Sequence, residues 1–282
     1  MILVFGKTGQ VAVELQRLEN VTALGREDVD LSNPHACAYA IRHHSPGAVI
    51  NAAAYTAVDK AEEEEELASV INGEAPIAMA EVCAELNIPL IYLSTDYVFE
   101  GTGKEAWNSK DLTAPQNAYG RSKLLGEIGV STNASVYAIL RTSWVVSAHG
   151  TNFVKAMLRL SETRNSLSVV GDQIGAPTPA KDIAVACLEI TKQLIIDPSK
   201  SGTYHFSGFP NVSWKEFAVE IFKLADKIVT VNSITTAQYP TPALRPLNSR
   251  MNCISTEQTF GLKRPSWKRG LKKILKELKA NE

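Results

Sequence analysis

The chain has 282 residues, of which 45% are hydrophobic and 21% charged, which is an ordinary composition for a globular protein. Its 29 basic and 30 acidic residues give a net charge of −1, which provides no field to attract nucleic acid or an anionic membrane. No apolar run approaches the roughly 20 residues of a membrane span, and no signal peptide precedes Gly6. We therefore expect a cytoplasmic protein with neither a nucleic-acid nor a membrane partner.

The first element is a strand followed by a glycine turn and a helix. Ile2–Phe5 is an apolar run, the length of a buried strand, and the sequence GKTGQVA follows from Gly6 to Ala12. Gly6 permits a tight turn, Gly9 lets the backbone approach a pyrophosphate, and Ala12 lets the helix pack closely on the strand. A P-loop is excluded, because its first glycine would have to stand at Met1. The pattern predicts a dinucleotide site, although an ordinary strand-to-helix turn would look the same.

The second strand, residues 21–24, ends at Gly25 and Arg26. NAD-selective sites usually place an acid here for the ribose 2′-hydroxyl, whereas a guanidinium suits the 2′-phosphate of NADPH. Arg26 thus favours NADPH, with NADH as the alternative, and an exposed loop arginine explains the residue equally well. Asp28 and Asp30 could still contact the adenosine half.

Helices and strands continue to alternate up to residue 140. We expect a helix over 34–44, a strand over 48–50, one long helix from about 59 to 86, a strand over 89–93, a helix that carries Tyr119 and Lys123, and a strand over 135–140. Five strands alternating with helices in about 140 residues predict an α/β fold, a doubly wound parallel (Rossmann) sheet. Right-handed crossovers bring the glycine turn, the small residues after the third strand and Thr95 to one edge.

Beyond residue 146 the pattern becomes irregular. We expect a helix over 179–194, a short strand over 203–206 that returns to the main sheet, a helix capped by Ser213 and Glu216, and an amphipathic helix from Ser266. The predicted domains are a dinucleotide-binding Rossmann domain over 1–146, to which about 179–207 returns, and a smaller C-terminal α/β substrate-binding domain over most of 147–282.

Tyr119 and Lys123 stand four residues apart and so share one face of the predicted helix. A neighbouring cation favours the phenolate and lowers the pKa of a tyrosine, which would let Tyr119 lend a proton near neutral pH. The hydroxyl of Thr95 could orient a carbonyl beside that phenol. Most Tyr-x-x-x-Lys pairs are ordinary helix neighbours, but here the glycine turn supplies a cofactor for the pair to serve.

Seven stretches along the chain together resemble the extended short-chain dehydrogenases/reductases and, within them, the dTDP-4-dehydrorhamnose reductase family. They are residues 5–11, 51–59, 94–99, 119–127, 141–144, 172–178 and 240–246. The resemblance implies an oxidoreductase that uses NADPH to reduce the C4 keto group of dTDP-4-dehydro-L-rhamnose, the last step of dTDP-L-rhamnose synthesis for polysaccharides.

The same resemblance implies roles for individual residues. Tyr119 would be the general acid, Lys123 would lower its pKa and hold the nicotinamide ribose, and Thr95 would hydrogen-bond the substrate oxygen. The expected cofactor-binding residues are Gly6, Gly9, Gln10, Val11, Arg26, Asp30, Leu31, Ala53, Ala54, Tyr55, Tyr119 and Lys123. The expected substrate-binding residues are Thr95, Asp96, Trp144, Asn152 and Arg245.

The chain departs from the family pattern in two places. Val146 and Ser147 stand where family members often have Tyr-Gly, so the resemblance does not establish which residues form this part of the substrate-pocket wall. Some relatives dimerise through a magnesium cluster of three glutamates, of which Glu14 and Glu277 match two, but Lys181 occupies the third position. Because a cation disfavours a divalent metal beside it, we expect no metal site, and either a monomer or a homodimer.

Two other classes of function stay open. Some proteins of this fold are non-catalytic regulatory subunits that bind a methionine adenosyltransferase, but the set Thr95, Tyr119 and Lys123 argues against that reading. Another nucleotide-sugar reductase, epimerase or dehydratase would share the cofactor turn. Dehydratases usually carry acids beside the catalytic hydroxyl, and no Glu follows Asp96 here.

Overall fold

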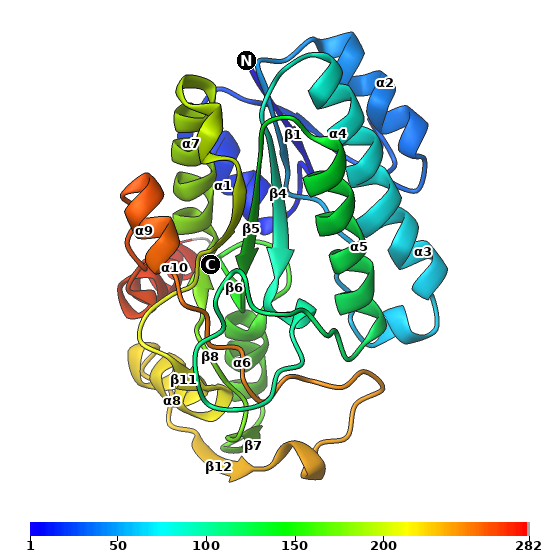
Figure 1. Ribbon diagram of the computed structural model, residues 1–282. Helices are drawn as coiled ribbons and strands as arrows, with labels where there is room; N and C mark the ends of the chain where they lie inside the picture. The colour runs from blue at the N-terminus through cyan, green and yellow to red at the C-terminus, as the bar shows by residue number, and fades with distance from the viewer. Residues whose placement is uncertain (281–282) are drawn as a thin grey trace.

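A six-stranded parallel sheet forms the centre of the protein in the computed structural model, which describes residues 1–280 (Figure 1). The strand order is β10-β5-β4-β3-β1-β2. The strands are β1 (Ile2–Phe5), β2 (Thr22–Leu24), β3 (Ala48–Asn51), β4 (Leu90–Thr95), β5 (Tyr137–Thr142) and β10 (Gly202–His205). The chain leaves β1 for β2 on one side and returns to β3 on the other. This change of direction opens a crevice at the carboxyl ends of β1 and β3, where doubly wound sheets bind ligands.

Helices cover both faces of the sheet. On one face lie α1 (Gln10–Leu18) and α7 (Ala180–Ile196), and on the other α2 (Pro34–His44), α4 (Ala75–Glu85) and α5 (Ala118–Asn133). Successive strand residues alternate between the two cores, as Val4 packs in the first and Leu3 in the second. The predicted doubly wound fold is confirmed.

The predicted strand near residue 203 does join the main sheet. β10 pairs in parallel with β5, with Thr203 opposite Ile139. β5 itself begins two residues later than expected, at Tyr137. The pairing adds a sixth strand to the sheet, while the domain boundaries remain a prediction.

The prediction of one long helix from about 59 to 86 is wrong. The segment divides into a 3₁₀ turn (Lys60–Glu62), α3 (Glu65–Ser69), a π-helical turn (Val70–Glu74) and α4. Pro76 has no N–H to give the carbonyl of Asn72, four residues earlier. That carbonyl instead accepts a 2.7 Å hydrogen bond from the hydroxyl of Tyr92 on β4. The regular α-helical hydrogen bonding is therefore interrupted at Asn72, next to the sheet.

The rest of the chain forms a third hydrophobic core below the sheet in Figure 1. Its elements are α6 (Phe153–Ser161), β7 (Ser166–Val170), β8 (Ile174–Gly175), β11 (Val212–Ser213), α8 (Trp214–Leu224), β12 (Thr230–Ile234) and α10 (Trp267–Ala280). Beside them lie β6 (Val145–Val146), β9 (Thr178–Pro179) and α9 (Ile254–Phe260). The predicted capping box is present, because Ser213 and Glu216 bond to each other's backbone N–H groups at the start of α8.

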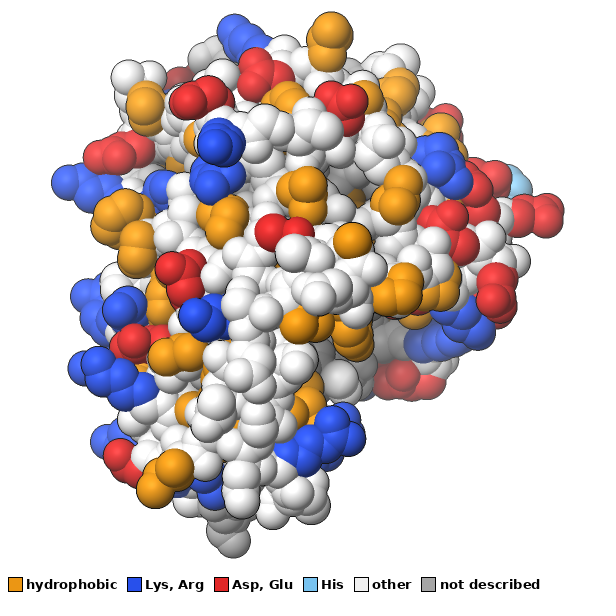
Figure 2. All heavy atoms as spheres, turned by 90° about the horizontal axis from the view of Figure 1, so that it is seen from below, with side chains coloured by type: hydrophobic (Ala, Val, Ile, Leu, Met, Phe, Trp, Pro, Cys, Tyr) orange, Lys and Arg blue, Asp and Glu red, His pale blue; other side chains and the backbone are white. Residues whose placement is uncertain are grey.

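The surface shows charges of both signs. On the face in Figure 2, Lys and Arg side chains are interspersed with Asp, Glu and apolar side chains, and no continuous basic patch covers the described atoms. None of the helices within residues 1–280 combines the length and the apolar character needed to cross a membrane.

Candidate active site

A cleft of about 770 Å³ opens at the carboxyl ends of β1, β3, β4 and β5. It extends from the glycine turn to the first residue of α8. The predicted residues that line it are Gly6, Gly9, Gln10, Val11, Arg26, Asp30, Leu31, Ala53, Ala54, Tyr55, Thr95, Asp96, Tyr119, Lys123 and Trp144. The fold thus brings to one cavity residues that lie more than 100 positions apart in the sequence.

The glycine turn is closely packed against the end of β3. Gly6 has a φ of +105°, and a Cβ there would lie 3.0 Å from the backbone nitrogen of Ala53. α1 starts directly after Gly9, which offers no side-chain cap, and its first intrahelical bond runs from the N–H of Val13 to the carbonyl of Gly9. The preceding N–H groups have no helical partner, and they suit the oxygens of a pyrophosphate.

The side chain of Asn72 holds the segment after β3 in place through two hydrogen bonds. Its side-chain oxygen accepts a 2.8 Å hydrogen bond from the N–H of Tyr55, and its amide donates a 3.0 Å bond to the Tyr55 carbonyl. The Tyr55 hydroxyl donates to Glu64 at 2.8 Å. Ala53 and Ala54 therefore line the cleft on a fixed backbone.

Arg26 lies at the mouth of the cleft with its side chain 80% exposed. Its Nε is 3.1 Å from Oδ2 of Asp30, whose other oxygen accepts a hydrogen bond from the N–H of Ser32. That backbone bond is the largest cause of the lowered pKa of Asp30, and Arg26 adds to it. The exposed guanidinium is free to turn toward a phosphate.

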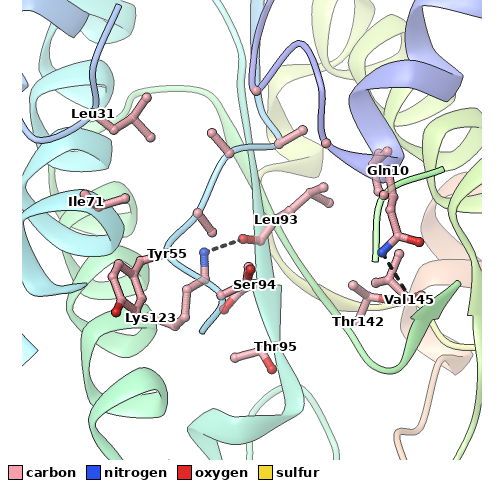
Figure 3. A pocket seen from close by; sticks show the side chains of 18 of the residues that line it. Gln10, Leu31, Tyr55, Ile71, Leu93, Ser94, Thr95, Lys123, Thr142 and Val145 are labelled. Carbon is pink, nitrogen blue, oxygen red and sulfur yellow. Dashed lines mark hydrogen bonds between the residues drawn. The ribbon is translucent and has the colours of Figure 1, made fainter. Parts of the chain in front are cut away.

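Lys123 is buried at the centre of the cleft (Figure 3). Its Nζ donates a 2.7 Å hydrogen bond to the carbonyl of Leu93 on β4, and lies 3.9 Å from the ring centroid of Tyr92. Burial lowers the pKa of Lys123 to about 7, while the charge of Glu127 acts in the opposite direction. The ammonium is thus only weakly favoured at neutral pH.

The pKa of Tyr119 is raised, whereas the sequence led us to expect a lowered value. Burial raises the pKa of Tyr119 to about 12, the neighbouring hydroxyl of Thr95 lowers it, and the charge of Asp96 raises it. Desolvation of the phenol dominates here, and the Lys123 ammonium is held at the Leu93 carbonyl. That Lys123 lowers the pKa of Tyr119 stays a prediction. Tyr119 is therefore a phenol at neutral pH, with its proton available.

Asp96 follows Thr95 at the end of β4. Thr95 donates a 3.1 Å hydrogen bond to Oδ1 of Asp96, and Oδ2 is buried with no hydrogen bond to the described residues. Burial raises the pKa of Asp96 to about 6, with the hydroxyls of Ser249 and Thr95 opposing the rise. A buried carboxyl oxygen facing a cleft is suited to accept from, or donate to, a ligand hydroxyl.

A buried ion pair between Arg141 and Glu127 packs next to β4. The sequence analysis gave this pair no role. Arg141 bonds Glu127 at 2.6 and 2.9 Å, and the hydroxyl of Ser94 donates to the same carboxylate at 2.5 Å. Glu127 lies one helical turn after Lys123, so the i,i+4 spacing was the available signal. The pair anchors α5 to β4 and β5 next to the Lys123 site.

Trp214, the first residue of α8, also lines the cleft. Its ring stacks on that of Trp144 with centroids 3.6 Å apart. No local pattern in the sequence marks Trp214, because it lies 70 positions beyond Trp144.

Two predicted substrate residues, Asn152 and Arg245, are not among the residues that line the cleft. Asn152 caps α6, and its amide donates to Oε1 of Gln10 at 3.0 Å. Arg245 is held by Asp59 at 2.7 Å. Both side chains are engaged by protein partners, and their roles in substrate binding stay a prediction.

The structure shows what Val146 and Ser147, the first departure from the family pattern, contact. Val146 belongs to the third core, and the hydroxyl of Ser147 donates to Oε1 of Gln10 at 2.8 Å. Gln10 in turn donates to the carbonyl of Val145 at 3.4 Å, as Figure 3 shows. Ser147 therefore acts on the cleft through Gln10.

The second departure lies outside the cleft, between α1 and α10. Ligand atoms of Glu14, His149 and Glu277 all lie within 4.8 Å of one another, and Arg17 bonds Glu277 at 2.6 Å. Lys181 lines a small cavity beside them. The sequence analysis missed His149 as a member of this cluster, and the expectation of no metal stays a prediction.

Known proteins are similar to this one over nearly the whole chain. The model of the family described as "RmlD substrate binding domain" matches residues 1–280. The chain is 42% identical over 284 residues to the dTDP-4-dehydrorhamnose reductase of Sinorhizobium fredii, covering 97% of this chain and 96% of that one. It is 41% identical over 291 residues to that of Salmonella typhimurium, covering 98% and 97%.

A solved structure gives the same result. The dTDP-4-dehydrorhamnose reductase of Bacillus anthracis, determined in complex with NADP, superimposes with a TM-score of 0.91 at 35% identity, covering 98% of each chain. The residues of the cleft, the full-length sequence identity and the fold agree, and the chain belongs to the RmlD substrate binding domain family.

Proposed function

We propose that this protein reduces the C4 keto group of dTDP-4-dehydro-L-rhamnose to give dTDP-L-rhamnose, with NADPH as the reductant. The observation that carries the proposal is the convergence of Thr95, Tyr119 and Lys123 on the cleft that begins at the glycine turn. Relatives at about 40% identity over nearly their full length carry the name of this reductase, and a reductase of the same name at 35% identity has been solved with NADP.

The residues of the cleft fit the cofactor. The free N–H groups at the start of α1 suit the pyrophosphate, Arg26 suits the 2′-phosphate, and Ala53 and Ala54 leave room for a flat ring system. The remaining cofactor contacts are assigned to Gly6, Gly9, Gln10, Val11, Asp30, Leu31, Tyr55, Tyr119 and Lys123. When bound, NADPH supplies the hydride.

The proton comes from the protein. Tyr119 is a phenol at neutral pH and lines the cleft together with Thr95, so it can donate a proton to a substrate oxygen that the Thr95 hydroxyl also contacts. As negative charge develops on that oxygen, the buried Lys123 ammonium opposes the cost of forming a phenolate in a desolvated site. Lys123 would also hold the nicotinamide ribose.

The substrate side of the cleft is assigned to Asp96 and Trp144, which line it, while Asn152 and Arg245 would need to rearrange to take part. We assign cofactor binding to residues 1–146 with about 179–207, and substrate binding mainly to 147–282. We expect the enzyme to act in the cytoplasm as a monomer or homodimer.

The test is to mix the protein with NADPH and dTDP-4-dehydro-L-rhamnose, follow the absorbance of NADPH, and identify the product by mass. The expected result is NADPH loss matched by a product two hydrogens heavier, with slower loss of NADH. Turnover of the sugar nucleotide without consumption of cofactor would show an epimerase. No turnover, together with copurification of a larger enzyme, would favour a regulatory subunit.

A further inference from the structure

Trp144 and Trp214 form an aromatic stack on the wall of the cleft. Their ring centroids are 3.6 Å apart and their planes differ by 14°. Trp144 follows the end of β5 in the main sheet, whereas Trp214 begins α8 in the third core. The stack therefore joins the two halves of the cleft through two side chains.

Trp144 is also closely packed against Gly175. A Cβ on Gly175 of β8 would lie 2.9 Å from Cε2 and 3.0 Å from Cζ2 of the indole. β8 pairs with β11, with Gly175 opposite Val212, and Trp214 follows directly after β11. One short ribbon thus supplies Gly175 and leads directly into Trp214, and both residues pack against Trp144.

The backbone at Trp144 needs this support. Its φ is +49°, in the left-handed region that bulky residues seldom adopt. Such a conformation persists where surrounding contacts determine it, and it often occurs where a side chain must point into a functional site.

Trp214 is itself supported from the protein core. Phe153 packs against Trp214 at 4.6 Å and stacks on Phe217 at 5.6 Å, and Phe217 contacts Trp267 at 5.3 Å. This row of rings leads from the cleft into the third core, so Trp214 has a rigid backing.

The indole N–H groups divide the four tryptophans into two pairs. Trp107 donates to the carbonyl of Asn248 at 3.1 Å, and Trp267 donates to that of Pro210 at 2.7 Å. Among the described residues, the indole N–H groups of Trp144 and Trp214 have no such acceptor. Neither nitrogen is among the fully buried polar atoms that lack a hydrogen bond. Packing contacts, and no indole hydrogen bond within residues 1–280, orient these two rings, and their N–H groups remain available to a ligand.

We propose that Trp214 is a positioning residue for the sugar nucleotide, which holds Trp144 in the orientation that binds it. Trp214 covers one face of Trp144, so a base or sugar ring cannot stack there. Trp144 instead presents its edge and its N–H to the substrate. This inference rests on the proposed function, because it takes the occupant of the cleft to be a nucleoside diphosphate sugar.

The test is a double-variant cycle with Trp214→Ala, Trp144→Ala and the combination, read by circular dichroism, by the Kd of dTDP in the NADP-bound protein, and by steady-state kinetics. Trp214→Ala should abolish the exciton signal of the stacked indoles. It should weaken dTDP binding and raise the KM for the keto sugar about 2- to 10-fold, the range expected for one aromatic pair. The KM for NADPH and the kcat should change little.

The combined variant separates a positioning role from direct contact. If Trp214 acts through Trp144, Trp214→Ala should add no further loss in the Trp144→Ala protein. Additive losses, or an unchanged Kd for dTDP in Trp214→Ala, would overturn the proposal. Trp214→Phe, which keeps a stacking ring, should restore most of the affinity.

Gly175→Ala provides a second route if Trp214→Ala fails to fold. Its new methyl group would lie within 3.0 Å of the Trp144 indole and displace that ring without altering Trp214, so the exciton signal and the dTDP affinity should fall together. Unchanged affinity with an altered exciton signal would count against the proposal. If the wild-type protein binds dTDP but does not oxidise NADPH, the proposed function fails, while the cycle on dTDP still tests the inference.

Discussion

The Nζ of Lys123 donates a 2.7 Å hydrogen bond to the backbone carbonyl of Leu93. This bond ties the lysine on α5 to the strand that ends, two residues later, at Thr95. Tyr119 lies one helical turn before Lys123, so one helix and one strand end together place all three groups. The cost of this arrangement is a buried ammonium with little compensating charge.

That cost predicts a pH dependence of stability. The pKa of Lys123 falls from 10.5 to about 7 on folding, so between these values the unfolded chain binds more protons than the folded one. The free energy of unfolding of the cofactor-free protein should therefore rise as the pH increases from about 7 to about 9. Urea unfolding of the wild type and of Lys123→Met measures it. Parallel pH profiles for the two proteins would contradict the assignment.

Tyr119→Phe should reduce kcat by about 10²- to 10⁴-fold, the usual contribution of a positioned general acid. The Kd of NADPH, measured by fluorescence, should change little, because the substitution removes one hydroxyl and leaves the pocket shape intact. Tyr97→Phe is a matched control, since the Tyr97 ring lies edge-on to Tyr119 at 5.5 Å. Equal losses of kcat in both variants would argue against a specific proton donor at Tyr119.

The sequence was sufficient to predict the sheet and the position of the catalytic groups. Parallel strands deliver their carboxyl ends to one edge, so Gly6, Ala53 and Thr95 had to meet. The spacing of Tyr119 and Lys123 then placed them on one helical face. These features follow from local periodicity and crossover handedness, and both can be read from one chain.

Other features depend on long-range contacts that spacing does not show. The pKa of Tyr119 is set by burial, which reverses the expected direction. Asn152 and Arg245 were assigned from family resemblance, but their partners, Gln10 and Asp59, lie more than 140 positions away. The break in the helix before α4 was partly visible in Pro76, although its partner Tyr92 was not.

Glu127→Gln should destabilise the protein by about 3–5 kcal/mol, because it leaves the buried guanidinium of Arg141 without a counter-charge. The side chains of Arg141 and Glu127 are 6% and 5% exposed, so solvent compensates little. The combination with Arg141→Met should cost less than the sum of the two single variants. Urea unfolding measures all three proteins, and simple additivity would show that the two charges are not coupled.

Arg26→Ala should raise the KM for NADPH about tenfold and leave that for NADH nearly unchanged, since charge-assisted bonds to a phosphate contribute roughly 1.5–3 kcal/mol. Lys7→Ala is the matched control. Lys7 also lines the cleft and, like Arg26, is paired with an acid, at 3.4 Å with Glu27 and 3.6 Å with Asp28, but it is a point charge that lacks the planar fork of a guanidinium. A similar change for both cofactors in Arg26→Ala would show that Arg26 does not select the 2′-phosphate.

Removal of divalent metal should leave activity and thermal stability unchanged. The cluster of Glu14, His149 and Glu277 contains carboxylates, but Arg17 bonds Glu277 at 2.6 Å and lies 3.9 Å from Glu14. An arginine in that position already supplies the positive charge that a metal would bring, and it would repel an incoming cation.

The measurement is the unfolding temperature and kcat after treatment with EDTA, and again after adding Mg²⁺. A metal that binds only the folded protein raises the unfolding temperature in proportion to its occupancy, so even weak binding is detectable. A rise with Mg²⁺ that Glu14→Gln abolishes would overturn the prediction. A rise that persists in Glu14→Gln would place the metal elsewhere and leave the arginine-filled cluster as a purely ionic contact between α1 and α10.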